Sequence, residues 1–220
     1  MLKDYYNKNL YPLQDRILAL IDSAKTGFYL TGGTALSRFY LHHRYSDDLD
    51  FFQNMSPTFD NDLSEIINVL LKEQEFEFEV LIKSEKYFRS QLHYEDISIK
   101  MEFINDVPYH FGELKTFELF SKVDNIYNIL SNKITAIIDR DEPKDFVDIL
   151  YIWKNYSPDW KEIFKSATSK AAGIFPPIVA EKILNFNLDY LDNIKWIKTP
   201  EMEIIKYDRE KIGKDIIGVS

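Results

Sequence analysis

The sequence of 220 residues contains no cysteine, which excludes disulfide bonds and thiolate metal sites. It also lacks any run approaching the roughly 20 apolar residues that cross a bilayer. The first residues, MLKDYYNKNLYPLQ, have no apolar run of signal-peptide type. We therefore expect a soluble, cytoplasmic protein that makes no membrane contact.

Positive charge is also in short supply, because 27 Lys and Arg stand against 36 Asp and Glu, for a formal net charge of −9. Proteins that grip nucleic acid without sequence preference are normally basic. The balance argues against DNA as a partner, but it leaves room for a local basic cleft and for a basic protein partner.

Residues 28–52, FYLTGGTALSRFYLHHRYSDDLDFF, are the centre of what the chain does contain. An apolar triplet leads into Gly32, Gly33 and Thr34, a segment of helical character follows, and Asp48 and Asp50 end the stretch among apolar residues. This pattern predicts a strand, a glycine turn, a helix and a second strand. The glycines permit close approach of the backbone to a ligand, and the helix N-terminus offers free N–H groups. Phosphate is the ligand that such N–H groups bind most readily.

The rest of the chain changes from mixed helix and strand to helix alone. Period-two alternation predicts strands over residues 75–83, 87–96 and 97–106. Helical spacing predicts helices over 9–23, 62–74, 123–141, 143–156, 160–172 and 177–184, the second of them capped by Asp60 or Asn61. We expect an α+β (α/β-like) fold with a mixed sheet and flanking helices. A sheet domain over 1–118 and a helical domain over 119–220 are predicted, with no clear pattern in 185–220.

Asp48 and Asp50 alternate on a predicted strand, so both carboxylates point to one face and repel each other unless a cation lies between them. Mg²⁺, or Mn²⁺ in its place, is the hard cation that carboxylates and substrate phosphates hold together. Glu102, on the polar face of a later strand, would complete a two-metal site, with Asp106 as the fallback ligand. Each motif also has an ordinary explanation, as a tight turn, a solvated acidic cluster or an exposed polar-face Glu.

Lys133 and Arg140 fall within the apolar arc of the predicted 123–141 helix, where a cation needs a partner or a path to solvent. They either form internal ion pairs with Asp145 or Asp148 on the next helix, or reach nucleotide phosphates as positive charges. Lys144 is expected on the solvent side.

Three other polar features carry little chemistry. His42 and His43 are adjacent, so they do not face each other as a metal pair, and we expect them on a helix surface. Neither Thr34 nor Ser37 has a base at a recognisable spacing that would make it a nucleophile.

These motifs together resemble those of the AbiEii-type nucleotidyltransferase toxins, the toxin halves of type IV toxin–antitoxin (abortive infection) systems. That family belongs to the DNA polymerase β-like nucleotidyltransferase superfamily. The resemblance covers roughly residues 28–150 and rests on GGTAL (32–36), RYSDDLDFF (44–52), KMEFIND (100–106), NKITAIIDR (132–140) and KDFVDI (144–149).

The resemblance implies a polymerase β-type sheet, an NTP substrate and a role for each motif. It implies that Gly32, Gly33 and Thr34 hold the triphosphate and that Lys133 contacts the nucleotide. Asp48 and Asp50 match the metal-binding carboxylates of the family, and Asp145 matches an aspartate proposed as a base in some relatives. Family members transfer nucleotides, in characterised cases to the 3′ end of tRNA, and are restrained by a separately encoded antitoxin. The family's third carboxylate is often Asp, so the longer Glu102 makes that ligand a departure from the pattern.

Three functions stay open on the sequence. The first is an active, metal-dependent nucleotidyltransferase toxin that moves NMP from an NTP to an RNA end or a protein hydroxyl. The second is a binding protein that keeps the fold without the chemistry, which the acidic balance and Glu102 favour. The third is a nucleotidyltransferase acting on a cationic small molecule, which suits the net charge better than tRNA does.

Overall fold

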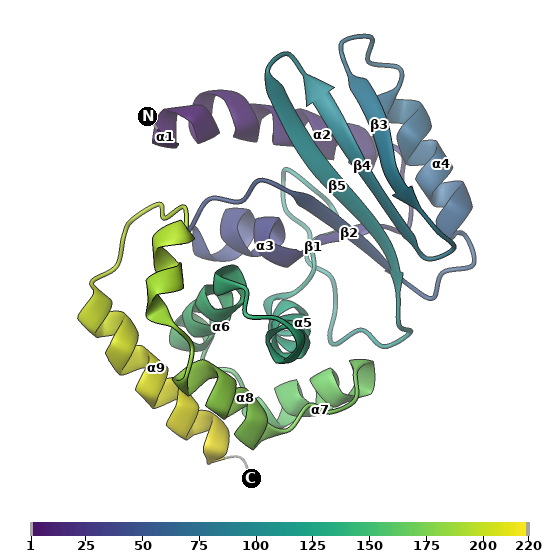
Figure 1. Ribbon diagram of the computed structural model, residues 1–220. Coiled ribbons are helices and arrows are strands. Elements are labelled where there is room, and N and C mark those ends of the chain that lie inside the picture. Colours follow the sequence, from purple (N-terminus) through teal and green to yellow (C-terminus); the bar gives the residue numbers. More distant parts are fainter. Residues whose placement is uncertain (1, 219–220) are drawn as a thin grey trace. The chain divides into compact units, whose positions relative to one another are not determined.

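A mixed sheet forms the frame of the first part of the chain in the computed structural model, which describes residues 2–218 (Figure 1). Its strands are β1 (Tyr29–Thr31), β2 (Leu49–Asn54), β3 (Glu77–Lys83), β4 (Tyr87–Tyr94) and β5 (Ile97–Asp106). Their spatial order is β1-β2-β5-β4-β3. The β2–β5 pair is parallel and the other neighbouring pairs are antiparallel. The mixed sheet predicted from the sequence is therefore confirmed.

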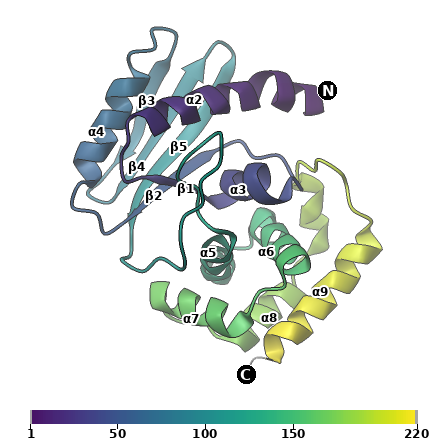
Figure 2. The ribbon, with the colours of Figure 1, turned by 180° about the vertical axis from the view of Figure 1, so that it is seen from behind.

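Two helices, α2 (Tyr11–Ser23) and α4 (Phe59–Leu70), cover one face of this sheet (Figure 2). The helices α1 (Leu2–Tyr5) and η1 (Tyr6–Leu10) lead into α2. β5 alternates buried and half-buried positions along most of its length, so the buried face of the strand points into the core with Met101 and Phe103. The opposite face keeps its polar side chains, including Lys100 and Glu102.

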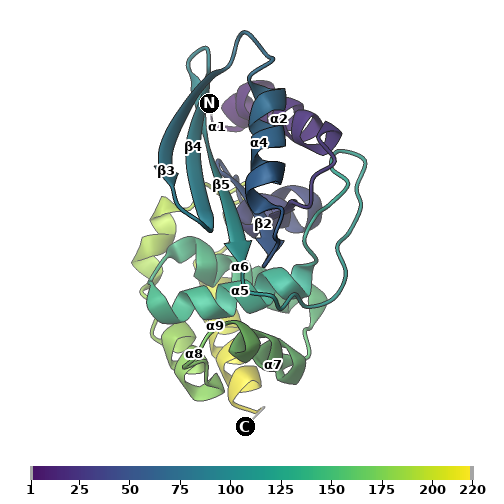
Figure 3. The same ribbon diagram turned by 90° about the vertical axis from the view of Figure 1, so that its right-hand side faces the viewer.

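The second part of the chain is helical: α5 (Ile126–Asp139), α6 (Pro143–Tyr156), α7 (Trp160–Lys170), α8 (Pro176–Leu184), η3 (Leu188–Asn193) and α9 (Met202–Ile217). α5 packs against α6, α7 and α8, and α9 packs against α6 and α8 (Figure 3). The bounds predicted for 143–156 are those of α6, where Pro143 occupies the first turn and needs no N–H partner.

The chain divides into two compact units that do not follow a single boundary. The first unit comprises residues 1–39, 45–108 and 113–124, and the second comprises 40–44, 109–112 and 125–220. Two short segments that precede residue 119 therefore belong to the helical unit. The division into domains 1–118 and 119–220 stays a prediction.

Several local predictions need correction. The glycines begin helix α3 (Gly32–Ala35) directly, and the chain continues as the π-helix η2 (Leu36–Leu41). β2 begins at Leu49, so Asp48 precedes the strand that was expected to carry both carboxylates. α4 begins after Thr58, which places Asp60 and Asn61 in its first turn and not at its cap.

α9 is the one long helix in residues 2–218 that the sequence pattern missed. Its buried positions include Asp208 and Gly213 beside Ile205, Ile212 and Ile216, so the apolar stripe is interrupted. Within the same range, no helix combines the length and the apolarity that crossing a bilayer requires.

Candidate active site

The glycine turn and Asp50 meet at the edge of the sheet. β1 pairs with β2 so that Thr31 lies opposite Asp50, and Gly32 follows with a φ of 68°. A Cβ added to Gly32 would lie 2.5 Å from Asp50 Oδ2. Only glycine combines this backbone conformation with this close approach, which explains why the motif needs it here.

Thr34 links the same turn to the segment before β2. Its hydroxyl lies 2.9 Å from Ser46 Oγ and also donates to the backbone carbonyl of Asp48. Thr34 is fully buried, so its hydroxyl fixes the carboxylate segment and is not available as a nucleophile. Two motifs that are separate in the sequence are thus joined by contacts at Gly32 and Thr34.

The carboxylates gather on the polar face of the sheet. Asp50 and Glu102 are register partners in the parallel β2–β5 pair. Lys100 reaches the same cluster, with its Nζ 3.0 Å from Asp48 Oδ2 and 3.7 Å from Glu102 Oε1. Burial opposes the charged form of Lys100, yet the hydrogen bond and charge of Asp48, with the charges of Glu102 and Asp50, raise the pKa of Lys100.

Glu102 is held by two further neighbours from β4. Its Oε1 accepts hydrogen bonds from the Tyr87 hydroxyl and from Arg89 Nε, each at 2.7 Å. Burial would raise the pKa of Glu102, but the Tyr87 hydrogen bond and the charges of Lys100 and Arg89 together lower it. Binding of a metal ion by Glu102 would therefore compete with the hydrogen bonds that Glu102 already accepts from Tyr87 and Arg89.

A divalent cation fits part of this arrangement. Asp48 and Asp50 supply the hard oxygen donors that Mg²⁺ and Mn²⁺ prefer, and the glycine backbone lies against Asp50 without a Cβ to obstruct it. Glu102 does not complete the set as it stands, because across residues 2–218 no three His, Cys, Asp or Glu side chains are grouped to hold a metal. The fallback, Asp106, pairs with Asn54 at the far end of β5, away from Glu102.

Lys133 lies in a buried ion-pair network of the second unit. α5 and α6 are joined by only residues 140–142, so they pack as neighbours. Lys133 Nζ is 2.7 Å from Asp145 Oδ1 and 2.8 Å from Asp148 Oδ2, and its side chain is 11% exposed. Burial disfavours its charge, but Asp148 and Asp145 outweigh this and raise the pKa of Lys133. The internal ion pair anticipated from the sequence is therefore present.

Asp148 is the centre of this network, which includes two residues that the sequence pattern did not relate to it. Arg44 binds it with two hydrogen bonds, from Nε to Oδ1 and from Nη2 to Oδ2, both at 2.8 Å. His43 Nε2 lies 2.9 Å from Asp148 Oδ1. The expectation that His43 lines a helix surface is wrong, because its ring is buried and packs near Tyr151.

Arg140 differs from the prediction in position. α5 ends at Asp139, so Arg140 lies at the cap and not within the apolar arc, and its side chain is 60% exposed. Its Nε binds Asp145 Oδ2 at 2.7 Å. Both oxygens of Asp145 thus face cations, and although burial alone would raise its pKa, Lys133 and Arg140 lower it. A carboxylate held this way is a poor proton acceptor, which favours an orienting role over that of a base.

The predicted residues thus form two groups. Gly32, Asp48, Asp50 and Glu102 come together in the first unit, with Thr34 fixing the segment and Gly33 following the turn. Lys133, Arg140 and Asp145 come together in the second unit. Lys100 and Arg44 were missed, although alternation on the 97–106 strand already assigns Lys100 to the face of Glu102.

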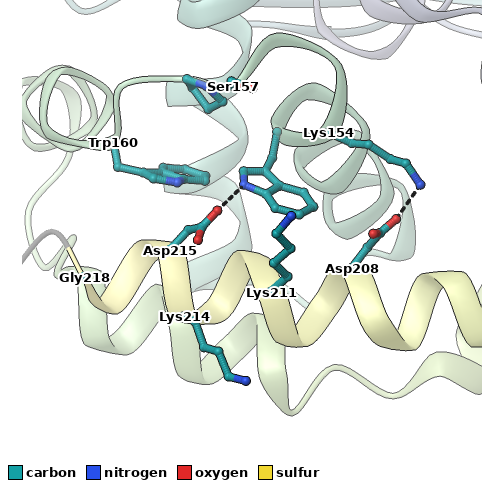
Figure 4. Close-up of a pocket in the computed structure, with 10 residues that line it drawn as sticks. Lys154, Ser157, Trp160, Asp208, Lys211, Lys214, Asp215 and Gly218 are labelled. Carbon is teal, nitrogen blue, oxygen red and sulfur yellow. Dashed lines mark hydrogen bonds and ion pairs between the residues drawn. The ribbon is translucent and has the colours of Figure 1, made fainter.

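A separate hollow in the second unit contains none of the predicted residues (Figure 4). It has a volume of about 670 Å³ and is lined by the ends of α6 and α9 and the start of α7. Trp153 Nε1 donates to Asp215, and Lys154 pairs with Asp208, so its carboxylates are already engaged.

Comparisons with known proteins give a family and a fold for this chain. The family model described as "Nucleotidyl transferase AbiEii toxin, Type IV TA system" matches residues 16–204. A protein of Aquifex aeolicus designated aq_aa25, described as uncharacterised, is 26% identical over 168 residues, which cover 72% of this chain and 73% of that protein.

Two solved structures share the fold. JHP933 from Helicobacter pylori superimposes with a TM-score of 0.63 at 19% identity, covering 94% of this chain and 90% of its own. MenT4, a nucleotidyltransferase toxin from Mycobacterium tuberculosis, gives a TM-score of 0.65 at 15% identity, covering 94% and 82%.

Proposed function

This chain belongs to the AbiEii family of nucleotidyltransferase toxins of type IV toxin–antitoxin systems, and we propose that it transfers NMP from an NTP to an RNA end in the cytoplasm. A tRNA 3′ end is the acceptor we favour, a protein hydroxyl is the alternative acceptor, and a separately encoded antitoxin is the expected partner. One observation supports the proposal above the others: the Gly32 backbone lies against the Asp50 carboxylate, which joins the two motifs that the chemistry requires.

Each group of residues has a proposed task. In nucleotidyl transfer the acceptor hydroxyl oxygen bonds to the α-phosphorus, the bond from that phosphorus to pyrophosphate breaks so that pyrophosphate leaves, and the hydroxyl proton passes to solvent water. Asp48 and Asp50 would hold a divalent cation, which supplies charge stabilisation for the phosphates when bound. Backbone N–H groups at Gly32, Gly33 and Thr34 would bind phosphate oxygens.

Lys133 and Arg140 would supply positive charge to the phosphates, as the family resemblance implies. Lys133 is held by Asp145 and Asp148, so its ammonium is oriented before any nucleotide arrives. Arg140 keeps most of its side chain in solvent while its Nε binds Asp145, and its proposed task is to donate to a phosphate when a nucleotide binds.

The test is incubation of the full chain with each labelled NTP, Mg²⁺ or Mn²⁺ and total tRNA. We expect label transfer that D50N and K133M abolish. D106N and K144M are matched controls, because each removes one charge of the same sign in the same unit outside the two groups. Transfer that survives D50N would contradict the site, and label appearing on a small cationic molecule in place of RNA would redirect the substrate assignment.

A second candidate, a nucleotidyltransferase fold that binds a protein without catalysis, is favoured by the bonds that Lys100 and Arg89 make to the carboxylates. Calorimetry with Mg²⁺ and an NTP separates the two functions. Absence of binding at millimolar nucleotide supports the second candidate, whereas binding supports the enzyme.

A further inference from the structure

Lys100 lies among the carboxylates of the site, although the fold does not need it there. Glu102 already accepts from Tyr87 and Arg89, so Lys100 is not needed to satisfy it. The shortest contact of Lys100 is to Asp48 instead, at 3.0 Å, and both side chains are about a third exposed. An ion pair this exposed contributes little to stability.

The charges of the cluster explain what the lysine does there. Asp48, Asp50 and Glu102 carry three negative charges, and Arg89 and Lys100 carry two positive charges, so the cluster is nearly neutral. Without Lys100, Asp48 would lose the cation that contacts it, and the negative charges near it would attract a cation from solution. The ammonium therefore stands where the carboxylates would otherwise attract a divalent cation.

We propose that Lys100 is an exchangeable counter-ion that makes this site select a complex of a divalent cation with a nucleoside triphosphate over the free cation. This inference rests on the proposed function. A divalent cation and the ammonium repel each other at the same carboxylates, so the free cation binds weakly. A triphosphate changes this balance, because its oxygens give the displaced ammonium a new partner.

The side chain suits such an exchange. Lysine is a compact charge on a flexible stem of four carbons, so its ammonium can move from Asp48 to a phosphate oxygen while β5 keeps its register. Arg89 cannot take over this task in the same way, because its planar guanidinium is engaged with Glu102 through Nε and Nη2.

The experiment measures Mn²⁺ binding by the paramagnetic resonance signal of free Mn²⁺, with the full chain and no nucleotide. We expect K100M to bind Mn²⁺ at least about tenfold more tightly than the wild type, because the competing charge is removed. K100R, which keeps the charge, should bind Mn²⁺ as weakly as the wild type. K83M removes a lysine from β3 in the same sheet and should leave the affinity unchanged.

The second measurement uses Mn²⁺ with an α,β-methylene NTP analogue, which binds without reacting. Here K100M should bind the complex about tenfold more weakly, because the phosphate loses its ammonium partner. A merely structural ion pair would not change the two affinities in opposite directions. Adding D48N to K100M should cancel the gain in Mn²⁺ affinity. K100Q replaces K100M if circular dichroism shows that the methionine variant does not fold.

The outcomes are distinguishable. Unchanged or weaker Mn²⁺ binding by K100M overturns the role of Lys100, and so does tight Mn²⁺ binding by the wild type without nucleotide. If the wild type binds the Mn²⁺–analogue complex and transfers nucleotide while K100M behaves like K83M, only this inference fails. If the wild type neither binds the complex nor transfers nucleotide, the proposed function fails.

Discussion

Removing the charge of Asp148 should destabilise the helical unit more than any other single isosteric change in the buried network. Asp148 is completely buried and accepts hydrogen bonds from Arg44, while His43 and Lys133 lie within 2.9 Å. Burial alone would raise its pKa, but Arg44 and Lys133 lower it well below its ordinary value. The carboxylate is therefore ionised, and D148N keeps its shape while it removes the charge.

The expected loss of stability in D148N follows from the charges that stay buried after the carboxylate is removed. In D148N the buried Arg44 loses the carboxylate that it binds through two nitrogens, and Lys133 loses one of its two carboxylate partners. The new amide also presents a donor where only an acceptor fits. Breaking a buried ion pair by changing one partner costs about 3–5 kcal/mol. Because domains are stable by only about 5–15 kcal/mol, D148N should lose a large share of the free energy of unfolding.

Urea unfolding followed by tryptophan fluorescence measures this loss in the relevant unit. All three tryptophans, Trp153, Trp160 and Trp196, belong to the second unit. D141N is the matched control, because Asp141 pairs with Lys182 at the surface and is 66% exposed, so its loss should stay below about 1 kcal/mol. If D148N also stays within about 1 kcal/mol of the wild type, the network does not stabilise the fold as argued.

Two further predictions concern the glycine turn and the buried histidine. G32A should reduce nucleotide transfer about a hundredfold, because the added Cβ displaces Asp50. The control G173A also has a positive φ, of 79°, but nothing lies near its Cβ. It should therefore keep transfer and lose only about 1–2 kcal/mol in urea unfolding from backbone strain. Equal transfer by the two variants would argue against the contact. Burial lowers the pKa of His43, so the unfolded chain binds the proton first and stability falls as the pH drops below about 6.5, by at most about 1.4 kcal/mol per pH unit. Unfolding between pH 7.5 and 5.5 should show this slope in the wild type and in the control H42Q but not in H43Q, and a slope that persists in H43Q would refute it.

Local patterns predicted the elements whose signals are uninterrupted. β5 was found because its alternation holds over most of the strand, and α6 was bounded correctly because Pro143 opens it. β3 alternates in sequence just as clearly, yet it is an edge strand with an irregular register near Val80, and its residues remain largely exposed. Alternation therefore predicts a strand but not which of its faces is covered.

The partners of Lys133 could be narrowed to two carboxylates because helices joined by a short connection must pack side by side. The ion pair between Arg44 and Asp148 could not be predicted, because the two residues are 104 positions apart and no sequence spacing relates them. His43 was misassigned for the same reason: it lies beyond the end of η2 at Leu41, and the distant Asp148 and Tyr151 contact its buried ring.

The acidic pair illustrates a limit of a different kind. Two carboxylates at alternate positions predict a cation, but they do not specify whether that cation is a metal or a side chain. The parallel pairing of β2 with β5 supplies a side-chain cation, because it sets Asp50 opposite Glu102 and thereby brings Lys100 to Asp48. A slip of one residue would turn Lys100 and Glu102 to the buried face. Lys100 and Glu102 therefore reach the acidic pair together or not at all. Measuring how Lys100 changes the affinity for a metal ion then distinguishes a pair of carboxylates neutralised by a side chain from a pair that binds a metal.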